Sequence, residues 1–340
     1  MVSTSPSRPN TSAPLRAGHA VDEARLWDRL MEIAKIGATE KGGVNRQAFS
    51  TEDRAAKRLL ADWGKEIGLD LFSDAVGNLF LRKAGSDPDA APVMSGSHLD
   101  SQVTGGKFDG TYGVMAALEA VRAIHQSGVA HRRPIEVVAW SNEEGSRFTP
   151  GCMGSEVFAG VQPLDAFLEV TDSKGVRMAD ELALTLADMT YARARSALTP
   201  LAPASYFEAH IEQGPRLERE GLPIGAVTSI QGSQRFTIEV YGVEGHAGTV
   251  PRALRKDALS AAVAMVGALE KHFHDPDDVV RFTVGRFQVL PGTPNTIPSH
   301  VHFSIDFRHP DDRTLTRLGG AVAAICQAAA GPCEVEVKMV

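Results

Sequence analysis

The sequence predicts an α/β fold, with a mainly parallel sheet covered by helices and a second, ferredoxin-like α+β domain. Two observations predict the first domain: short apolar runs alternate with stretches of helical periodicity, and a long crossover joins the run that ends at His98 to the run 135–140. A β-α-β-β-α-β order of elements after residue 215 predicts the second. We therefore expect a disordered tail at 1–20, a first domain at 21–214 and a second domain at 215–340.

The composition is typical of a soluble globular protein, with 43% hydrophobic and 23% charged residues among 340. The net charge of -7 gives no basic surface for nucleic acid or an anionic membrane, and no apolar stretch is long enough to span a bilayer. The first twenty residues are rich in Ser, Pro, Thr and Ala and lack the apolar centre of a secretory signal. Three cysteines form no disulfide framework, so we expect a cytoplasmic protein.

Helical spacing of apolar residues predicts two helices at the start of the first domain, at 21–35 and 50–67. The second is better marked, because Ser50 and Asp53 resemble a capping box and Gly68 follows the last apolar residue. Two runs of residues with high strand propensity, separated by a turn, predict strands at 69–73 and 78–82. The next expected elements are a helix at 111–126, a strand at 135–140 and a helix at 178–189.

A segment of strict alternation, S-Y-F-E-A-H-I-E, predicts one more strand, at 205–212. Its polar face carries Glu208, His210 and Glu212, which is the pattern of either an exposed edge or the wall of a site. A short helix at 216–220 is expected to follow. In the second domain we expect strands at 234–241, 280–289, 300–308 and 333–339, and helices at 257–271 and 315–329.

The stretch from residue 93 to residue 114 has the residue types of a metal site. His98 and Asp100 lie at the end of an apolar run, and a glycine-rich loop follows them. Asp109 comes shortly before the next expected helix. Imidazole and carboxylate groups suit zinc, cobalt, nickel or manganese, and glycines let the chain fold back towards the same ion. A hydrogen-bonded histidine at a strand end is the alternative interpretation of this stretch taken alone.

Other candidate ligands follow neighbouring strands. Glu143 and Glu144 come directly after the strand at 135–140, and the carboxyl ends of parallel strands are where open α/β sheets bind ligands. With His98, Asp109 and His210, they supply most of the ligands for two metal ions bridged by an aspartate. Such sites activate a water between the ions and stabilise the oxyanion that forms when it attacks a carbonyl.

Six motifs together resemble one family of hydrolases. They are G-S-H-L-D-S, G-G-K-F-D-G, N-E-E-G-S-R-F, F-E-A-H-I-E-Q-G-P, G-H-A-G-T-V-P-R and P-N-T-I-P. In the same order, they resemble motifs of the N-carbamoyl-L-amino-acid hydrolases, allantoate amidohydrolases and β-ureidopropionases. These enzymes form a branch of the dinuclear aminoacylase and carboxypeptidase-like superfamily. The resemblance extends over residues 21–340 and implies that the first domain is catalytic and the second a lid or dimerisation domain.

The resemblance also implies a role for each candidate residue of the first domain. His98, Glu144 and His210 would be metal ligands. Asp109 would bridge two divalent ions per chain, zinc or else manganese, cobalt or nickel. Glu143 would be the general acid and base, which takes a proton from the attacking water and returns it to the leaving amine.

Further roles concern the substrate. The resemblance implies that His246 stabilises the tetrahedral oxyanion from the lid domain, often that of a partner subunit. Asn295 and Arg308 of the lid, with Gln213, would bind the carboxylate of the substrate, a task for which the planar fork of arginine is suited.

We therefore expect a cytoplasmic, homodimeric, metal-dependent amidohydrolase with a small-molecule substrate. It would hydrolyse a linear ureido C–N bond of an N-carbamoyl-L-amino acid or allantoate and release ammonia and carbon dioxide. One alternative is an aminoacylase or dipeptidase of the same superfamily. Another is a non-catalytic dimeric remnant, because the family has a further histidine in a G-A-G-H-D-A motif that this sequence lacks up to Val340. We expect the C-terminal segment of the catalytic domain to be absent.

Overall fold

The protein consists of two compact units, Met1–Arg219 and Glu220–Val340. The structure, a computed structural model, describes residues 12–197 and 202–340. Each unit has a hydrophobic core of its own. In these described ranges, no helix combines the length and the apolar character needed to cross a bilayer.

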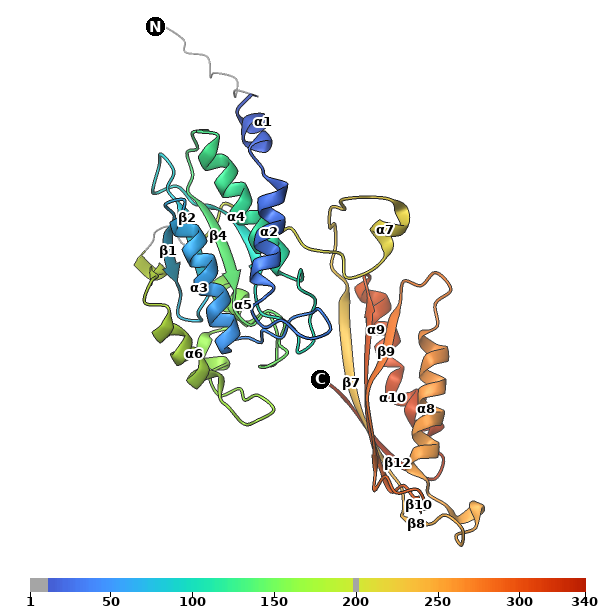
Figure 1. The fold of residues 1–340 in the computed structure, drawn as a ribbon. Coiled ribbons are helices and arrows are strands. Elements are labelled where there is room, and N and C mark those ends of the chain that lie inside the picture. Colours follow the sequence, from blue (N-terminus) through green and yellow to red (C-terminus); the bar gives the residue numbers. More distant parts are fainter. Residues whose placement is uncertain (1–11, 198–201) are drawn as a thin grey trace. The chain divides into compact units, whose positions relative to one another are not determined.

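The first unit is built on a mixed six-stranded sheet (Figure 1). In spatial order its strands are β5 (Arg193–Ala194), β1 (Asp70–Ser73), β2 (Leu79–Lys83), β4 (Ile135–Trp140), β3 (Val93–His98) and β6 (Ser205–Phe207). Pairing is parallel in β5–β1, β4–β3 and β3–β6, and antiparallel in β1–β2 and β2–β4. The expected parallel crossover from β3 to β4 is confirmed.

Helices cover both faces of this sheet. One face packs against α2 (Glu23–Ile33), α3 (Thr51–Lys65) and α4 (Thr111–Gln126), which together bury the largest apolar cluster of the unit. The other face packs against Phe158 of α5 (Met153–Ala159), and α6 (Met178–Asp188) belongs to a separate apolar cluster. The predicted cap of α3 is confirmed, because the Ser50 side chain accepts from the Asp53 N–H.

Two expectations for the first unit differ from the structure. Residues 1–11 lie outside the described part, but Ser12–His19 forms helix α1 where a disordered tail was expected, and it packs against α4. The strand expected at 205–212 ends at Phe207, because β3 pairs with it only as far as Ser95. Beyond this point Glu208–Glu212 is not part of the sheet.

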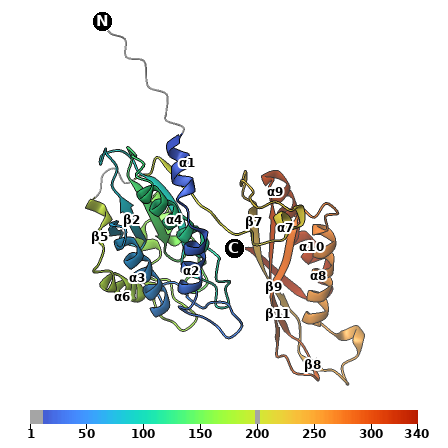
Figure 2. The same ribbon diagram turned by 45° about the horizontal axis from the view of Figure 1, so that its top comes forward.

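The second unit is a four-stranded antiparallel sheet covered on one face by helices (Figure 2). Its strands, in the order β12-β7-β11-β9, are Glu334–Met339, Gly232–Tyr241, His300–His309 and Arg281–Leu290. The helices are α8 (Ala258–Phe273), α9 (Asp312–Gly320) and α10 (Val322–Ala329), and a separate pair of short strands is β8 (Gly245–His246) with β10 (Thr296–Ile297). The predicted β-α-β-β-α-β order is confirmed, although the last expected helix is divided at Ala321. The short helix α7 (Arg216–Glu220) joins the two units in sequence.

Candidate metal centre

The segments that carry the candidate ligands leave adjacent strands of the first sheet. β3 and β4 pair in parallel with His98 opposite Trp140, so the loops after both strands emerge at one edge, as predicted. β6 pairs with β3 on its other side and brings the segment containing His210 to the same edge.

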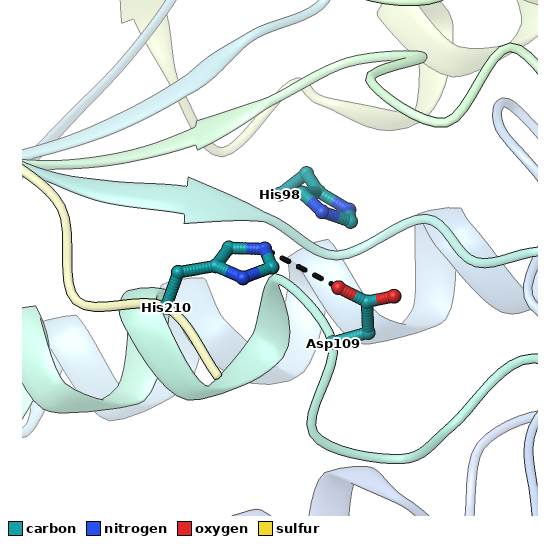
Figure 3. Close-up of side chains that lie close together, drawn as sticks. All are labelled: His98, Asp109 and His210. Atoms are coloured by element: carbon teal, nitrogen blue, oxygen red, sulfur yellow. Dashed lines mark ion pairs between the residues drawn. The ribbon is translucent and has the colours of Figure 1, made fainter. Parts of the chain in front are cut away.

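His98, Asp109 and His210 form the single group of possible metal ligands found in the described part of the chain (Figure 3). One ligand atom of each lies within 4.8 Å of the others, and His210 Nε2 is 3.2 Å from Asp109 Oδ1. The two imidazole ring centres are 6.1 Å apart. His98 is buried, whereas the His210 side chain is 34% exposed, so solvent and small molecules can reach the group from the His210 side.

Both imidazoles are oriented by backbone carbonyls. His98 Nδ1 lies 2.9 Å from the carbonyl oxygen of Asp100, and His210 Nδ1 lies 2.9 Å from that of Ile211. Because a carbonyl oxygen can only accept, each Nδ1 donates and the neutral ring keeps its lone pair on Nε2. Protein metal sites orient their histidine ligands in the same way.

Two glycines allow these segments to approach one another closely. Gly110 has a φ of +60°, and a Cβ at this position would collide with the ring of His98. A Cβ on Gly113, in the first turn of α4, would collide with the carbonyl oxygen of Ala209. The helix that follows Asp109 therefore packs directly on the backbone of the segment that leads into the third ligand.

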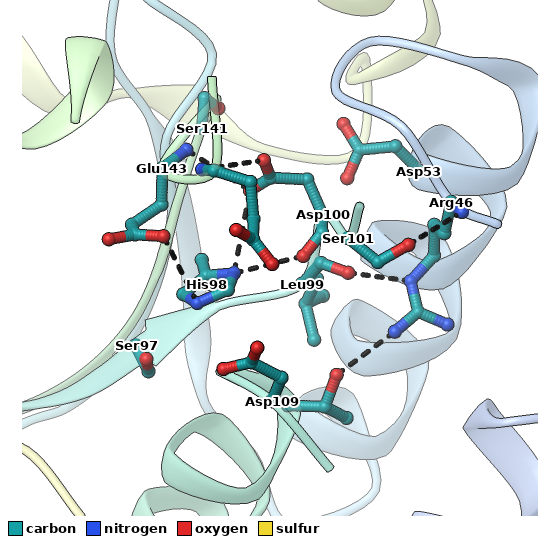
Figure 4. Close-up of polar contacts among 12 residues, drawn as sticks. Arg46, Asp53, Ser97, His98, Leu99, Asp100, Ser101, Asp109, Ser141 and Glu143 are labelled. Carbon is teal, nitrogen blue, oxygen red and sulfur yellow. Dashed lines mark hydrogen bonds and ion pairs between the residues drawn. The ribbon is translucent and has the colours of Figure 1, made fainter. Parts of the chain in front are cut away.

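Asp100 holds the loop that carries the two glutamates (Figure 4). The Glu143 N–H donates to Asp100 Oδ1 and the Glu144 N–H to Oδ2, both at 3.2 Å. Glu143 Oε2 then lies 3.3 Å from His98 Nε2. Glu144 is outside the three-residue group: its Oε2 accepts from Gln102 at 2.6 Å, and its buried Oε1 has no hydrogen-bond partner in the described part of the chain.

Burial and crowded carboxylates shift three pKa values at the centre. Burial lowers the pKa of His98, but the carboxylates of Asp100 and Glu143 outweigh this effect, so the pKa is raised above its ordinary value. Burial raises the pKa of Asp100 to about 6. Burial also raises the pKa of Glu144, and the nearby Asp109 carboxylate adds to the shift. A divalent cation here would offset the repulsion among these carboxylates.

The donor set fits a divalent metal. Two imidazole nitrogens and a carboxylate converge at His98, His210 and Asp109, and first-row divalent ions accept this combination of N and O ligands. Glu144 Oε1 is a buried acceptor without a hydrogen-bond partner among the described residues, and a cation would satisfy it. His98, Asp109 and His210 would therefore hold an ion, and Glu144 lies near enough to interact electrostatically with His98 and Asp109.

Three buried charged residues near the centre were not recognised from the sequence as part of its support: Arg46, Asp53 and Lys57. Lys57 Nζ lies 3.2 Å from Asp53 Oδ2 and donates to Ser141 Oγ at 2.8 Å, next to the loop that carries the glutamates. The sequence contained one signal of this burial: Asp53 and Lys57 have the helical spacing that places them on the same face of α3 as the apolar Leu60. A charge on an apolar helical face indicates a buried polar network.

Asn142 and Gln213 also contribute to the centre in ways that the sequence did not show. Asn142 adopts a φ of +51°, and its side-chain amide donates to the carbonyls of Phe148 and Pro150. Gln213, a candidate for binding the substrate carboxylate, donates instead to Asp109 Oδ2 at 2.5 Å.

The three candidate residues of the second unit do not lie together. His246 is opposite Thr296 in the β8–β10 pair, and the Asn295 carbonyl accepts from the Ala247 N–H at 2.9 Å, so these two candidates are neighbours. Arg308 is near the far end of β11, eight residues beyond His300, which at ~3.3 Å per residue is roughly 26 Å. A single chain therefore does not place Asn295 and Arg308 side by side.

Known proteins resemble this chain over most of its length. The model of peptidase family M20/M25/M40 matches residues 85–338. An N-carbamoyl-L-amino acid amidohydrolase of Geobacillus stearothermophilus is 43% identical over 285 residues, which are 84% of this chain and 69% of that protein. Allantoate deiminase 1 of Glycine max is 33% identical over 335 residues, with coverages of 91% and 69%. A crystal structure of an amidase of the hydantoinase/carbamoylase family from Burkholderia multivorans has a TM-score of 0.82 at 42% identity and covers 94% of this chain and 77% of that one.

Proposed function

Because the chain belongs to the hydrolases of peptidase family M20/M25/M40, we propose that it hydrolyses a linear ureido C–N bond. The proposed substrates are N-carbamoyl-L-amino acids or allantoate, and the products include ammonia and carbon dioxide. The names of two relatives support this substrate class. The observation that carries the proposal is the position of Glu143 Oε2, 3.3 Å from His98 Nε2 and therefore next to the metal-ligand group.

Two divalent ions per chain, zinc or else manganese, cobalt or nickel, are proposed as cofactors. His98, Glu144 and His210 would bind them, and Asp109 would bridge them. The clustering of His98, Asp109 and His210 supports this assignment, and the unpartnered Glu144 Oε1 supports a fourth ligand. When bound, such ions polarise a carbonyl and lower the pKa of a water.

Glu143 is proposed as the residue that moves the proton. Its carboxylate would accept a proton from the attacking water and donate it to the leaving nitrogen of the ureido group. The geometry supports this role, because Asp100 fixes the Glu143 backbone while the side chain remains 36% exposed and accessible to a substrate.

His246, Asn295, Arg308 and Gln213 are proposed to contact the substrate, with His246 facing the oxyanion and the others its carboxylate. The separation of Arg308 from His246 and Asn295 along β11 supports a homodimer. In such a dimer one chain would supply Arg308 and its partner the β8–β10 end of the second unit. Size-exclusion chromatography with light scattering tests this assembly, and a fully active monomer would refute it.

A cytoplasmic location is also proposed. It is supported by three cysteines that are all free, Cys152, Cys326 and Cys333, since a reducing compartment keeps thiols unpaired. Fractionation of the native host, followed by immunoblotting, would show whether the protein is in the soluble cytoplasmic fraction or is exported.

The proposed activity is tested by incubating the metal-loaded protein with N-carbamoyl-L-amino acids and with allantoate and measuring ammonia. N-acetyl amino acids and dipeptides serve as parallel substrates, because release of free amino acid from these would indicate an aminoacylase or dipeptidase instead. Metal-free protein prepared with a chelator is the control. No ammonia from any ureido substrate would refute the proposal.

A further inference from the structure

Arg46 is a fully buried arginine whose side-chain hydrogen bonds, among the described residues, all go to neutral acceptors, while the Asp53 and Asp100 carboxylates act on it from further away. It is 1% exposed. Its Nε donates to the Leu99 carbonyl at 2.6 Å, and its Nη2 donates to Thr111 Oγ1 at 2.9 Å. Its Nη1 donates to two carbonyls near the end of α2, those of Ile33 and Ile36, both at 3.1 Å. The guanidinium therefore fixes three chain segments at once.

Two of these segments carry proposed metal ligands (Figure 4). Leu99 directly follows His98, so the bond from Nε fixes the peptide immediately after this ligand. Thr111 is the first residue of α4, and its N–H donates to the Asp109 carbonyl at 2.5 Å. The guanidinium thus connects the chain beside His98 with the chain beside Asp109.

The backbone of Arg46 adds a second connection to the first of these segments. Its N–H donates to Ser101 Oγ and its carbonyl accepts from the Ser101 N–H, both at 2.9 Å. The residue is therefore held from both its main chain and its side chain against segment 98–101. A small movement of Arg46 would displace this segment relative to α4.

The chemistry of this position favours a role beyond packing. Burying a guanidinium that forms no direct ion pair is costly, and an apolar side chain of similar volume would avoid that cost. Only arginine has a rigid planar fork with five donors, which can bind carbonyls and a hydroxyl in several directions at once. Lysine would keep the charge but lose the connection between the two segments.

We propose that Arg46 is a positioning residue that sets the separation of His98 from Asp109 and thereby the affinity of the centre for metal. It does not touch the ion and acts through the Leu99 carbonyl and the Thr111 hydroxyl. This inference rests on the proposed metal centre, but it does not depend on which substrate is hydrolysed.

The test measures cobalt binding to metal-free protein by calorimetry, together with the visible absorption spectrum of the bound cobalt. Thr111→Val is the sharpest variant, because it keeps the shape of the side chain and removes only one end of the connection. Arg46→Lys removes the fork and keeps the charge. We expect both variants to bind cobalt about 10- to 100-fold more weakly, as for other groups that orient metal ligands, and to show an altered spectrum.

Arg82→Met is the matched control. Arg82 is also buried, at 7% exposure. It donates to the Pro88 carbonyl and to Glu136, the second residue of β4, whereas the loop that carries the glutamates follows the other end of that strand. We expect this variant to lose stability while its cobalt affinity and spectrum stay those of the wild type. Circular dichroism verifies the fold of each variant before titration.

Wild-type cobalt affinity and spectrum in folded Arg46→Lys and Thr111→Val would overturn the inference. If Arg46→Lys does not fold, Thr111→Val decides alone, because it leaves the other bonds of the guanidinium in place. A wild-type protein that binds no cobalt would refute the metal centre and this inference together. Cobalt binding without hydrolysis of any ureide would refute only the proposed function.

Discussion

Glu143 Oε2 lies 3.3 Å from Nε2 of His98, the nitrogen that faces the ligand group. We expect Glu143→Gln to lower kcat by about 10²- to 10⁴-fold, the usual contribution of a general acid or base. Metal content should stay unchanged, because the amide has the shape of the carboxylate and Asp100 still holds the backbone N–H. Steady-state kinetics and metal analysis of the same samples provide the measurement.

The matched control for that prediction is Glu169→Gln, because the Glu169 side chain is 79% exposed and has no contact with the centre. Its kcat should equal that of the wild type. An unchanged kcat in Glu143→Gln would remove Glu143 from its proposed role.

Arg308→Ala should raise KM for a ureido acid by at least about 10-fold, since a charge-assisted, two-pronged bond to the carboxylate would be lost. The Arg308 side chain is 51% exposed, and its Nε donates to Asp306 at 3.0 Å, so its other nitrogens are available to a ligand. Arg317→Ala is the control, because Arg317 is an exposed arginine on α9 of the same unit, and its KM should equal that of the wild type. If KM and metal content both match the wild type, the carboxylate is bound elsewhere.

Stability and metal affinity should depend on pH with opposite signs through His98. Its pKa is raised in the folded, metal-free protein. Its contribution to metal-free stability is therefore fully present below its ordinary pKa of about 6.5 and is lost as the pH rises through the folded value. Metal needs the neutral ring, so cobalt affinity should instead increase over the same rise.

The measurement compares wild type with His98→Asn from about pH 5.5 to 8.5, a range that brackets the ordinary histidine pKa. The difference in melting temperature between the metal-free proteins should shrink as the pH rises. A cobalt affinity of the wild type that is independent of pH in this range would contradict the prediction.

Cys152 should be a slow nucleophile although it is exposed. Its partly desolvated thiol lies 3.7 Å from Glu143 Oε1, and desolvation together with the Glu143 charge raises its pKa to about 11. At neutral pH we expect alkylation by iodoacetamide about 100-fold slower than for an ordinary exposed cysteine, because only the thiolate reacts. Peptide mass spectrometry follows the rate. Glu143→Gln should accelerate it, and an ordinary rate in the wild type would contradict this account.

Lys57→Met should lower the free energy of unfolding by about 3 to 5 kcal/mol, since it leaves the buried Asp53 carboxylate without its cation. The ion pair joins two side chains that are 1% and 2% exposed. Lys65→Met is the control, because Lys65 pairs with Asp62 on the same helix at 49% and 58% exposure and should change stability by less than about 0.5 kcal/mol. Urea unfolding measures both, and equal losses would contradict the prediction.

Local sequence patterns correctly predicted the helices and strands that pack against the rest of the domain along their whole length. The helix Thr111–Gln126 and the strand Ile135–Trp140 have the predicted bounds, because continuous apolar faces determine them. The alternation after Ser205 failed for a non-local reason. Ala209 lies against the first turn of α4, and the segment leaves the sheet to bring His210 to Asp109. No alternation pattern shows where a partner strand ends.

The sequence pointed to residues that cluster at the candidate site but not to the residues that support them. The resemblance to N-carbamoyl-L-amino-acid hydrolases is confirmed by the family match and the relatives, and the clustering of His98, Asp109 and His210 agrees with the ligands it implied. Arg46 was not found, because its acceptors are backbone carbonyls and a hydroxyl of distant segments, and these leave no motif in the sequence.

The pairing of β6 with β3 also determines when the centre can assemble as the chain folds. His98 and Asp109 are neighbours on one crossover, but His210 follows more than a hundred residues later and joins them only after Ser205 has docked opposite Val93. Closing a loop of this length has an entropic cost that the final contacts must offset. During synthesis, an ion that arrives early would meet an incomplete set of ligands.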